Sequence, residues 1–262
     1  MLSSAALRTG LALLLGATFA ASALAQAKKA PSTYAPESGQ PGKDVVWVPT
    51  PQALVDKMLD MAKVTPRDFV MDLGSGDGRT VITAAKRGAR ALGVEYNPDM
   101  VELSKRNAEK AGVAGKASFV KADLFETDLS PASVITMFLL PDINMKLRPK
   151  ILELRPGTRI VSNTFDMGEW KPDATADITG ESCETSWCKA LLWIVPAKVA
   201  GSYRLPQGEL ELKQQFQDLS GTLRTAGKAF VLTGQVRGED VSFTAGGRKY
   251  SGRMDGGTLT LR

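Results

Sequence analysis

The stretch that decides the fold is Phe69-Val70-Met71-Asp72-Leu73-Gly74-Ser75-Gly76-Asp77-Gly78-Arg79-Thr80. It begins with an apolar run, passes through three glycines at alternate positions and enters a segment of helical spacing that ends at Gly88. Glycine adopts turns that are closed to other residues and lets a ligand approach the backbone closely. The order of strand, glycine loop and helix therefore predicts a ligand-binding turn at the end of a buried strand.

The surrounding chain repeats this alternation from about residue 44 to residue 172. Short apolar runs predict strands at 69–71, 91–94, 118–120, 134–138 and 159–161. Segments of helical spacing predict helices at 50–62, 80–88, 97–112 and 146–153. Strands separated by single helices indicate a parallel sheet in an α/β, Rossmann-like domain.

After about residue 180 the helical spacing disappears. Short alternating segments such as 209–213 are separated by turn residues at Gly227, 237–240 and 246–247. This pattern predicts an antiparallel β-rich domain, either a small barrel or a sandwich. We therefore predict an α/β domain at 44–178 and a β-rich C-terminal domain at 179–262, with the linker between them within 172–190.

Residues 1–25 have the pattern of a secretory signal peptide. Arg8 precedes an apolar run, and Ala23-Leu24-Ala25 supplies an A-x-A cleavage site. An uncleaved membrane anchor is the alternative, although the run is short for a span of about 20 residues. Residues 26–43 are predicted to form a disordered leader. The expected location is the periplasm, after cleavage following Ala25 and with no stable membrane span.

The composition excludes several kinds of site. The chain of 262 residues has no histidine and two cysteines, which removes histidine-based triads and the usual zinc sites, so no metal is expected. A net charge of +5 is too small for a dedicated nucleic-acid-binding protein, and no nucleic-acid partner is expected. The oligomeric state is not indicated.

Cys183 and Cys188 lie five positions apart. In an oxidising compartment such a pair can close a small loop, and we predict a structural disulfide. Two free thiols are the alternative, and the spacing is not that of a C-x-x-C redox centre. The neighbouring Trp187, like Trp193, is expected to be a core residue.

The glycine spacing distinguishes the loop from two phosphate-binding loops. A nicotinamide-binding loop has the pattern G-x-G-x-x-G, but residue 79 is an arginine here. A Walker A loop requires Gly-Lys-Ser/Thr, which is absent. Asp72 would repel a pyrophosphate, and it suits a ligand with a cationic amino-acid part and no phosphates.

At this point the sequence resembles the class I S-adenosylmethionine-dependent methyltransferases, whose first motif is an acidic residue followed by x-Gly-x-Gly-x-Gly. Glu95 ends the second predicted strand and Asp123 the third. The resemblance implies that Glu95 accepts the ribose hydroxyls and that Asp123 contacts the adenine amino group; taken singly, each is also explained as a helix cap or a solvated carboxylate. It implies S-adenosyl-L-methionine as cofactor, bound by Asp72, Gly74, Ser75, Gly76, Asp77, Gly78, Glu95, Tyr96, Asp123 and Leu124.

Three further stretches indicate a particular family within this class: Trp47-Val48-Pro49-Thr50-Pro51, Thr136-Met137-Phe138-Leu139-Leu140-Pro141, and Arg155-Pro156-Gly157-Thr158-Arg159-Ile160-Val161-Ser162. These look like the lysine methyltransferases that modify the ATP synthase c-subunit, and their bacterial relatives. The likeness covers roughly residues 44–172. It implies methyl transfer to a protein lysine.

A methyl group on a sulfonium is already activated, so transfer needs mainly alignment with the acceptor. A desolvated channel lowers the lysine pKa, which is about 10.4 in water, so no histidine base is required. We expect Trp47–Pro49 to form one wall and the residues after the fourth strand the other: Thr136, Phe138, Leu139, Leu140, Pro141 and Asn144. Strand core running into a helix cap is the alternative for 138–140, and no general base is identified.

Two other functions remain open at this stage. One is an exported cofactor- or ligand-binding protein that keeps the fold without turnover. The other is a methyltransferase that acts on a small molecule.

Overall fold

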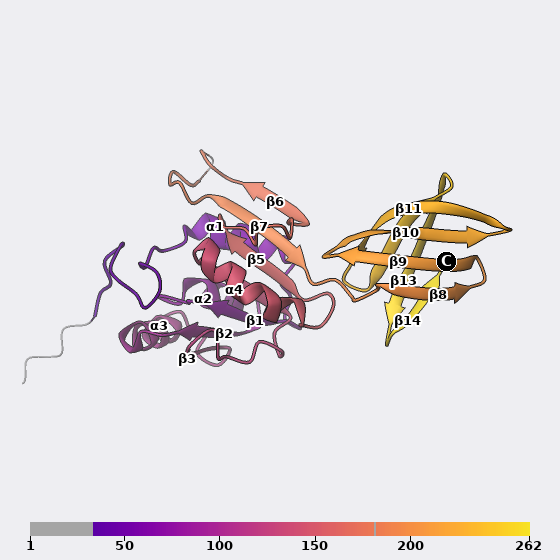
Figure 1. Cartoon of the computed structure of the whole chain (residues 1–262). Coiled ribbons are helices and arrows are strands. Elements are labelled where there is room, and N and C mark those ends of the chain that lie inside the picture. Colours follow the sequence, from indigo (N-terminus) through magenta and orange to yellow (C-terminus); the bar gives the residue numbers. More distant parts are fainter. Residues whose placement is uncertain (1–33, 181) are drawn as a thin grey trace, which may run out of the picture. The chain divides into compact units, whose positions relative to one another are not determined.

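The structure, a computed structural model, describes residues 34–180 and 182–262 (Figure 1). The predicted signal peptide and residues 26–33 of the predicted leader lie outside these ranges. A first sheet has the strand order β3-β2-β1-β4-β5-β7-β6. Its strands are β1 (Phe69–Leu73), β2 (Arg90–Glu95), β3 (Ala117–Lys121), β4 (Val134–Met137), β5 (Arg159–Asn163), β6 (Ala174–Asp177) and β7 (Lys189–Ile194).

Strands β1 to β5 are parallel, and this confirms the predicted α/β class. The helices are α1 (Gln52–Met61), α2 (Arg79–Lys86), α3 (Pro98–Lys110) and α4 (Pro141–Leu152). Alternate strand residues face opposite sides of the sheet. Val70 therefore shares a core with α1, α2 and α3, whereas Met71 and Leu73 share a second core with α4.

Two helices show how local sequence sets their start. Asn97 caps α3 because its side chain accepts hydrogen bonds from the backbone N–H groups of Asp99 (2.9 Å) and Met100 (3.5 Å). Helix α4 begins at Pro141, five residues before the predicted start. Proline suits the first helical position because its φ is already helical and its missing N–H has no partner there.

The predicted domain boundary at 178/179 and the linker at 172–190 differ from the structure. Strand β7 pairs antiparallel with β5, with Arg159 opposite Ile194, and β6 pairs with β7. The first sheet therefore extends to Ile194. The apolar run of β7 predicts a strand, but only its pairing with β5 shows that this strand belongs to the first sheet.

Residues 34–43 were predicted to be disordered, and this prediction is wrong for the part of the leader that the structure describes. The backbone N–H of Gly39 donates to the carbonyl of Trp47 (2.7 Å), and the N–H of Trp47 donates to the carbonyl of Gln40 (2.9 Å). Lys43 forms an ion pair with Asp123. The proline-rich composition indicates that the segment has no stable structure by itself. Its partners in these contacts, Trp47 and Asp123, lie outside residues 34–43.

The C-terminal part forms a second, antiparallel sheet in the order β14-β13-β12-β11-β10-β9-β8 (Figure 1). Its edge strands β8 and β14 come into contact, so the sheet is nearly closed, as a small barrel would be. The strands are β8 (Gly201–Leu205), β9 (Gly208–Gln215), β10 (Asp218–Thr225), β11 (Lys228–Arg237), β12 (Asp240–Ala245), β13 (Arg248–Asp255) and β14 (Thr258–Leu261). Within residues 34–180 and 182–262, no helix is both long and apolar enough to cross a membrane.

Candidate functional site

The glycine loop joins β1 to α2 and has a backbone that favours glycine. Gly74, Gly76 and Gly78 have φ values of +75°, +55° and +83°, in the left-handed region. A Cβ on Gly76 would clash with Nε1 of Trp47, and one on Gly78 would lie 2.8 Å from the Phe119 ring. The indole of Trp47 therefore lies directly against the loop.

Glu95 ends β2 and fixes the position of the glycine loop. Its Oε2 accepts the backbone N–H of Gly76 at 2.9 Å, and its Oε1 accepts the N–H of Asn97 at 2.9 Å. Each carboxylate oxygen has a second lone pair that these bonds do not use. The carboxylate can therefore hold the loop and still accept hydrogen bonds from a ligand.

Asp72 is buried at the end of β1. The hydroxyl of Thr136 donates to its Oδ1 at 2.6 Å. Burial raises the pKa of Asp72 to about 7, and the neighbouring charges of Glu95 and Asp77 contribute to the rise, against the hydrogen bond from Thr136. A ligand cation placed beside this carboxylate would favour its ionised form.

Asp123 follows β3 and has both a cap and a charged partner. Its Oδ1 accepts the backbone N–H of Phe125 (2.9 Å), and its Oδ2 lies 2.5 Å from Nζ of Lys43. The hydrogen bond with Lys43 is the main cause that holds the pKa of Asp123 below its usual value. The same ammonium lies 4.7 Å from the centre of the Tyr96 ring. Lys43 thus contacts two of the predicted cofactor residues, Tyr96 and Asp123.

Asp77 is held by the helix that follows the loop and by α3. Nε and Nη2 of Arg79 donate to its carboxylate at 3.0 and 2.6 Å, and Nδ2 of Asn107 donates to its carbonyl at 3.0 Å. Ser104 donates to the carbonyl of Gly76 at 2.7 Å. The buried hydroxyl of Ser75 has no hydrogen-bond partner among the described residues.

These groups surround one cavity at the carboxyl ends of the parallel strands, with ≈ 1060 Å³ of empty space, part of it open to solvent. Nine of the ten predicted cofactor residues line it; Gly78 is instead the N-cap of α2. Residues 40–50 line it as well, and they include the predicted wall Trp47–Pro49. Lys43 was missed because no local pattern links it to Asp123, 80 positions away.

The residues predicted for the acceptor wall separate into two groups. Phe138 and Leu139 line the cavity, and Leu140 lines a second hollow beside it. Thr136, Pro141 and Asn144 line neither hollow. Thr136 holds Asp72 instead, and Asn144 donates to the carbonyls of 165 and 166, both at 3.1 Å.

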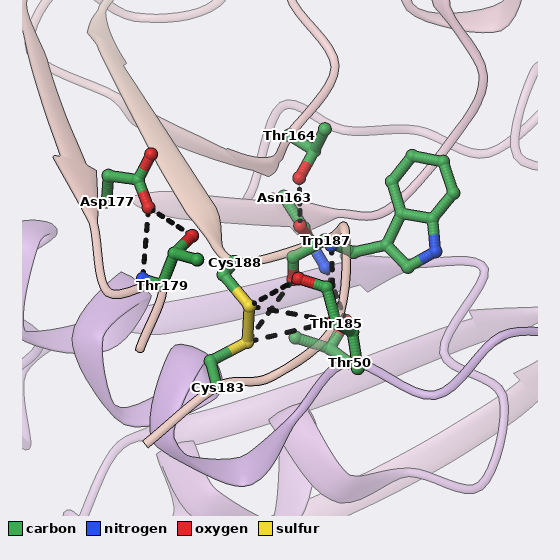
Figure 2. The surroundings of a disulfide bond; sticks show 9 residues. All are labelled: Thr50, Asn163, Thr164, Asp177, Thr179, Cys183, Thr185, Trp187 and Cys188. Carbon is green, nitrogen blue, oxygen red and sulfur yellow. Dashed lines mark hydrogen bonds between the residues drawn. A yellow bond between two sulfur atoms is a disulfide. The ribbon is translucent and has the colours of Figure 1, made fainter. Parts of the chain in front are cut away.

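The loop between β6 and β7 carries the disulfide Cys183–Cys188, whose Cα atoms lie 5.8 Å apart (Figure 2). Trp187 belongs to this loop and is half-buried, so the expectation of a core residue is wrong for Trp187, whereas Trp193 is fully buried. Among the residues that the structure describes, no three Cys, Asp or Glu side chains come together as a metal site requires.

The chain has the fold and the site of a class I S-adenosylmethionine-dependent methyltransferase. A glycine loop follows the first strand, carboxylates lie at the ends of the first three strands, and the parallel sheet is extended by the antiparallel strand β7. The residues fit this cofactor, because the buried carboxylate of Asp72 could neutralise its cationic amino-acid part and the carboxylate of Glu95 retains acceptors for its ribose hydroxyls. The family model of the ANTKMT methyltransferase domain matches residues 72–174.

Known proteins of this class align with the same part of the chain. A protein-lysine N-methyltransferase of Saccharolobus islandicus is 50% identical over 131 residues, which are 49% of this chain and 81% of that protein. The lysine N-methyltransferase of the ATP synthase c-subunit from Mus musculus is 38% identical over 142 residues, 54% of this chain but only 56% of that protein. The chain belongs to this family of methyltransferases.

A solved structure of a methyltransferase is also similar to this chain. The RNA methyltransferase from Salinibacter ruber, in complex with S-adenosyl-L-homocysteine, is 47% identical, with a TM-score of 0.54. The match covers 58% of this chain and 96% of that one. S-Adenosylmethionine is therefore the cofactor of this protein.

Proposed function

We propose that the protein transfers methyl groups from S-adenosylmethionine to lysine amines of a protein substrate. The observation that carries the proposal is the set of Asp72, Glu95 and Asp123 around the glycine loop, in a chain that is 50% identical over 131 of its residues to a protein-lysine N-methyltransferase. The cofactor fold is common to many methyl acceptors, so the choice of lysine rests on these relatives.

The cofactor supplies an electrophilic methyl group on a sulfonium. In the transfer, the lone pair of the amine forms the N–CH₃ bond, the S–CH₃ electron pair returns to sulfur, and the amine loses a proton to solvent. The chain's own contribution is positional: Asp72 would hold the amino-acid part of the cofactor, Glu95 the ribose and Asp123 the adenine. Exclusion of water by the apolar residues Phe138 and Leu139 favours the neutral amine that this step requires.

The first experiment is calorimetric titration of residues 26–262 with S-adenosylmethionine and S-adenosylhomocysteine. We expect micromolar binding of both. The folded, disulfide-intact chain is then incubated with labelled cofactor and envelope proteins, and methylated positions are located by mass spectrometry. Label on lysine supports the proposal. Absence of binding would overturn the cofactor assignment, and label on RNA or on small molecules alone would overturn the lysine acceptor.

Binding of the cofactor without transfer to any acceptor would favour the alternative of a binding protein. The matched control is Glu95→Ala in the same assay. If calorimetry shows that this variant binds the cofactor weakly, label that persists at the wild-type level would come from a contaminating enzyme.

We also propose that the protein is exported to the periplasm. The signal-peptide pattern of residues 1–25 supports this, and so does the Cys183–Cys188 disulfide, since such bonds persist in oxidising compartments. Fractionation of cells that express the full chain should place it in the periplasm with Gln26 as its first residue. A cytoplasmic protein that retains residue 1 would contradict the proposal.

A further inference from the structure

Three aromatic side chains from separate parts of the first sheet meet at one place. Phe138 follows β4, Phe165 follows β5, and Trp187 lies in the loop between β6 and β7. Their ring centres are 6.0 Å (Phe138–Phe165), 5.9 Å (Phe138–Trp187) and 5.4 Å (Phe165–Trp187) apart. All three are half-buried, so part of each ring remains accessible.

This aromatic cluster lines the second hollow, which adjoins the cofactor cavity. Phe138, Leu139 and the segment 41–46 line both hollows. The second hollow has ≈ 920 Å³ of empty space and is open to solvent. The second hollow therefore shares part of its wall with the cofactor cavity, and an acceptor side chain held in it would lie beside that cavity.

The chemistry of the hollow suits an alkyl chain that ends in a cation. Aromatic faces attract ammonium groups through their quadrupole, and their apolar surface accommodates methylenes and N-methyl groups. Asp44, which is exposed on 44% of its side chain, supplies a carboxylate to the same hollow. The nearby Lys43 is already paired with Asp123 at 2.5 Å, which leaves Asp44 a weaker contact at 3.8 Å.

The disulfide loop determines where Trp187 lies. Cys183 and Cys188 are both buried, and the backbone N–H of Trp187 donates to Oγ1 of Thr185 at 3.1 Å within the loop they close. The indole points away from the sulfur atoms (Figure 2) and contacts the two phenylalanines. The disulfide loop lies beyond residue 174, where the match to the family model ends.

We propose that Phe138, Phe165 and Trp187 form the acceptor site, which takes a lysine side chain and retains it once it carries methyl groups, and that the Cys183–Cys188 disulfide holds Trp187 in this site. The proposal rests on the proposed function and names its substrate class. A site that binds methylated ammonium permits successive transfers to the same nitrogen.

The test uses the cation directly, because the natural acceptor is not needed. The protein, saturated with S-adenosylhomocysteine, is titrated with Nα-acetyl-Nε-trimethyl-lysine amide and with its neutral tert-butyl isostere, and binding is followed by NMR. We expect the cation to bind roughly threefold to thirtyfold more tightly than the isostere, which is the range of a cation–π contact. Equal affinity for the two probes would overturn the proposal.

Two variants locate the effect. Trp187→Leu keeps an apolar side chain but removes the ring, and it should abolish most of the preference for the cation; Trp187→Phe should keep part of it. Affinity for S-adenosylhomocysteine should be unchanged in both. A preference that survives in Trp187→Leu would overturn the assignment of Trp187. Failure of the wild-type protein to bind S-adenosylhomocysteine would instead contradict the proposed function.

The disulfide is tested with the double variant Cys183→Ser, Cys188→Ser. Affinity for the trimethyl-lysine probe should decrease as in Trp187→Leu, while S-adenosylhomocysteine binding persists and shows that the protein is folded. Full probe affinity in this double variant would overturn the positioning role of the disulfide.

Discussion

The two sheets of this protein place their polar residues in different ways. In the first sheet, Asp72 and Glu95 end adjacent parallel strands, and burial raises the pKa of Asp72 to about 7. In the second sheet, the buried strand residues are apolar, and charged side chains such as Arg204 and Glu209 lie in solvent. The first sheet therefore has carboxylates at the carboxyl ends of its strands, whereas the second sheet has an apolar interior.

The difference follows from how the strands are connected. Parallel strands need crossover helices, so all their carboxyl ends meet at one edge, where loops can surround a ligand. Antiparallel strands return through tight turns at both ends, such as 226–227 at one end and 238–239 at the other. Substitutions at the carboxyl ends of the first sheet should therefore change cofactor affinity, whereas substitutions in the second sheet should change only stability.

The largest effect is expected for Glu95→Ala. The variant removes charged acceptors for the ribose, each hydrogen bond being worth about 1.5–3 kcal/mol, and it releases the N–H groups of Gly76 and Asn97. We expect cofactor affinity to decrease by about a hundredfold or more, measured by calorimetry. Glu211→Ala, on the exposed face of β9, is the matched control and should leave affinity unchanged. A change of less than roughly threefold in Glu95→Ala would remove Glu95 from the site.

A glycine pair compares the two sheets in stability. Gly78 and Gly227 both have positive φ, +83° and +73°, which costs an alanine about 1–2 kcal/mol. A Cβ on Gly78 would also meet Phe119 and Ser104 at 2.8 and 2.9 Å, whereas one on Gly227 would have no described residue within 4 Å apart from its chain neighbours. Gly78→Ala should lower the free energy of unfolding in urea by roughly 1–3 kcal/mol more than Gly227→Ala.

Only the Gly78 variant should weaken cofactor binding as well. Equal losses of stability in the two variants would show that the crowding around Gly78 is relieved by small movements of Phe119. The loop would then tolerate a side chain.

A pH effect should come from Asp72. Its pKa is about 7 when folded and 3.8 ordinarily, so the folded protein binds the extra proton between these values. The free energy of unfolding without ligand should therefore decrease as pH rises from about 4 to about 7. Because a cationic ligand favours the ionised form, cofactor affinity should instead rise with pH, by up to about tenfold per unit below 7.

Denaturation and calorimetry between pH 5 and 8 test this, and Asp72→Asn should flatten both profiles. In the second sheet, burial raises the pKa of Tyr203 from 10.0, outside this range. A wild-type affinity profile that is already flat would contradict the role of Asp72.

The smallest effect is expected for Lys43→Met. The ammonium of Lys43 contacts Asp123 and the Tyr96 ring, where the adenine is expected. Removing this charge should strengthen cofactor binding by a few-fold at low salt and by less at high salt, since exposed ion pairs are screened. Weaker binding in the variant would mean that Lys43 contacts the cofactor instead of competing with it.

Most of the cofactor site was predictable because its signals are local. Asp72 lies at the end of β1 and the three glycines come directly after it, Glu95 ends β2, and Asp123 follows β3. The carboxyl ends of parallel strands meet whatever the details of packing, so these residues converge. The acceptor wall was less predictable, because Thr136 near the end of β4 holds Asp72, whereas Phe138 and Leu139 just after it line the cavity.

The sequence by itself determined the α/β class, the glycine loop, the carboxylates and the antiparallel C-terminal part, because periodicity and turn residues act over a few positions. Only the tertiary structure decided that β7 joins the first sheet, that Lys43 pairs with Asp123, and that Trp187 meets Phe138 and Phe165. Each of these contacts joins residues at least 22 positions apart. Such contacts depend on strand register and on the packing of loops, which no short stretch of sequence specifies.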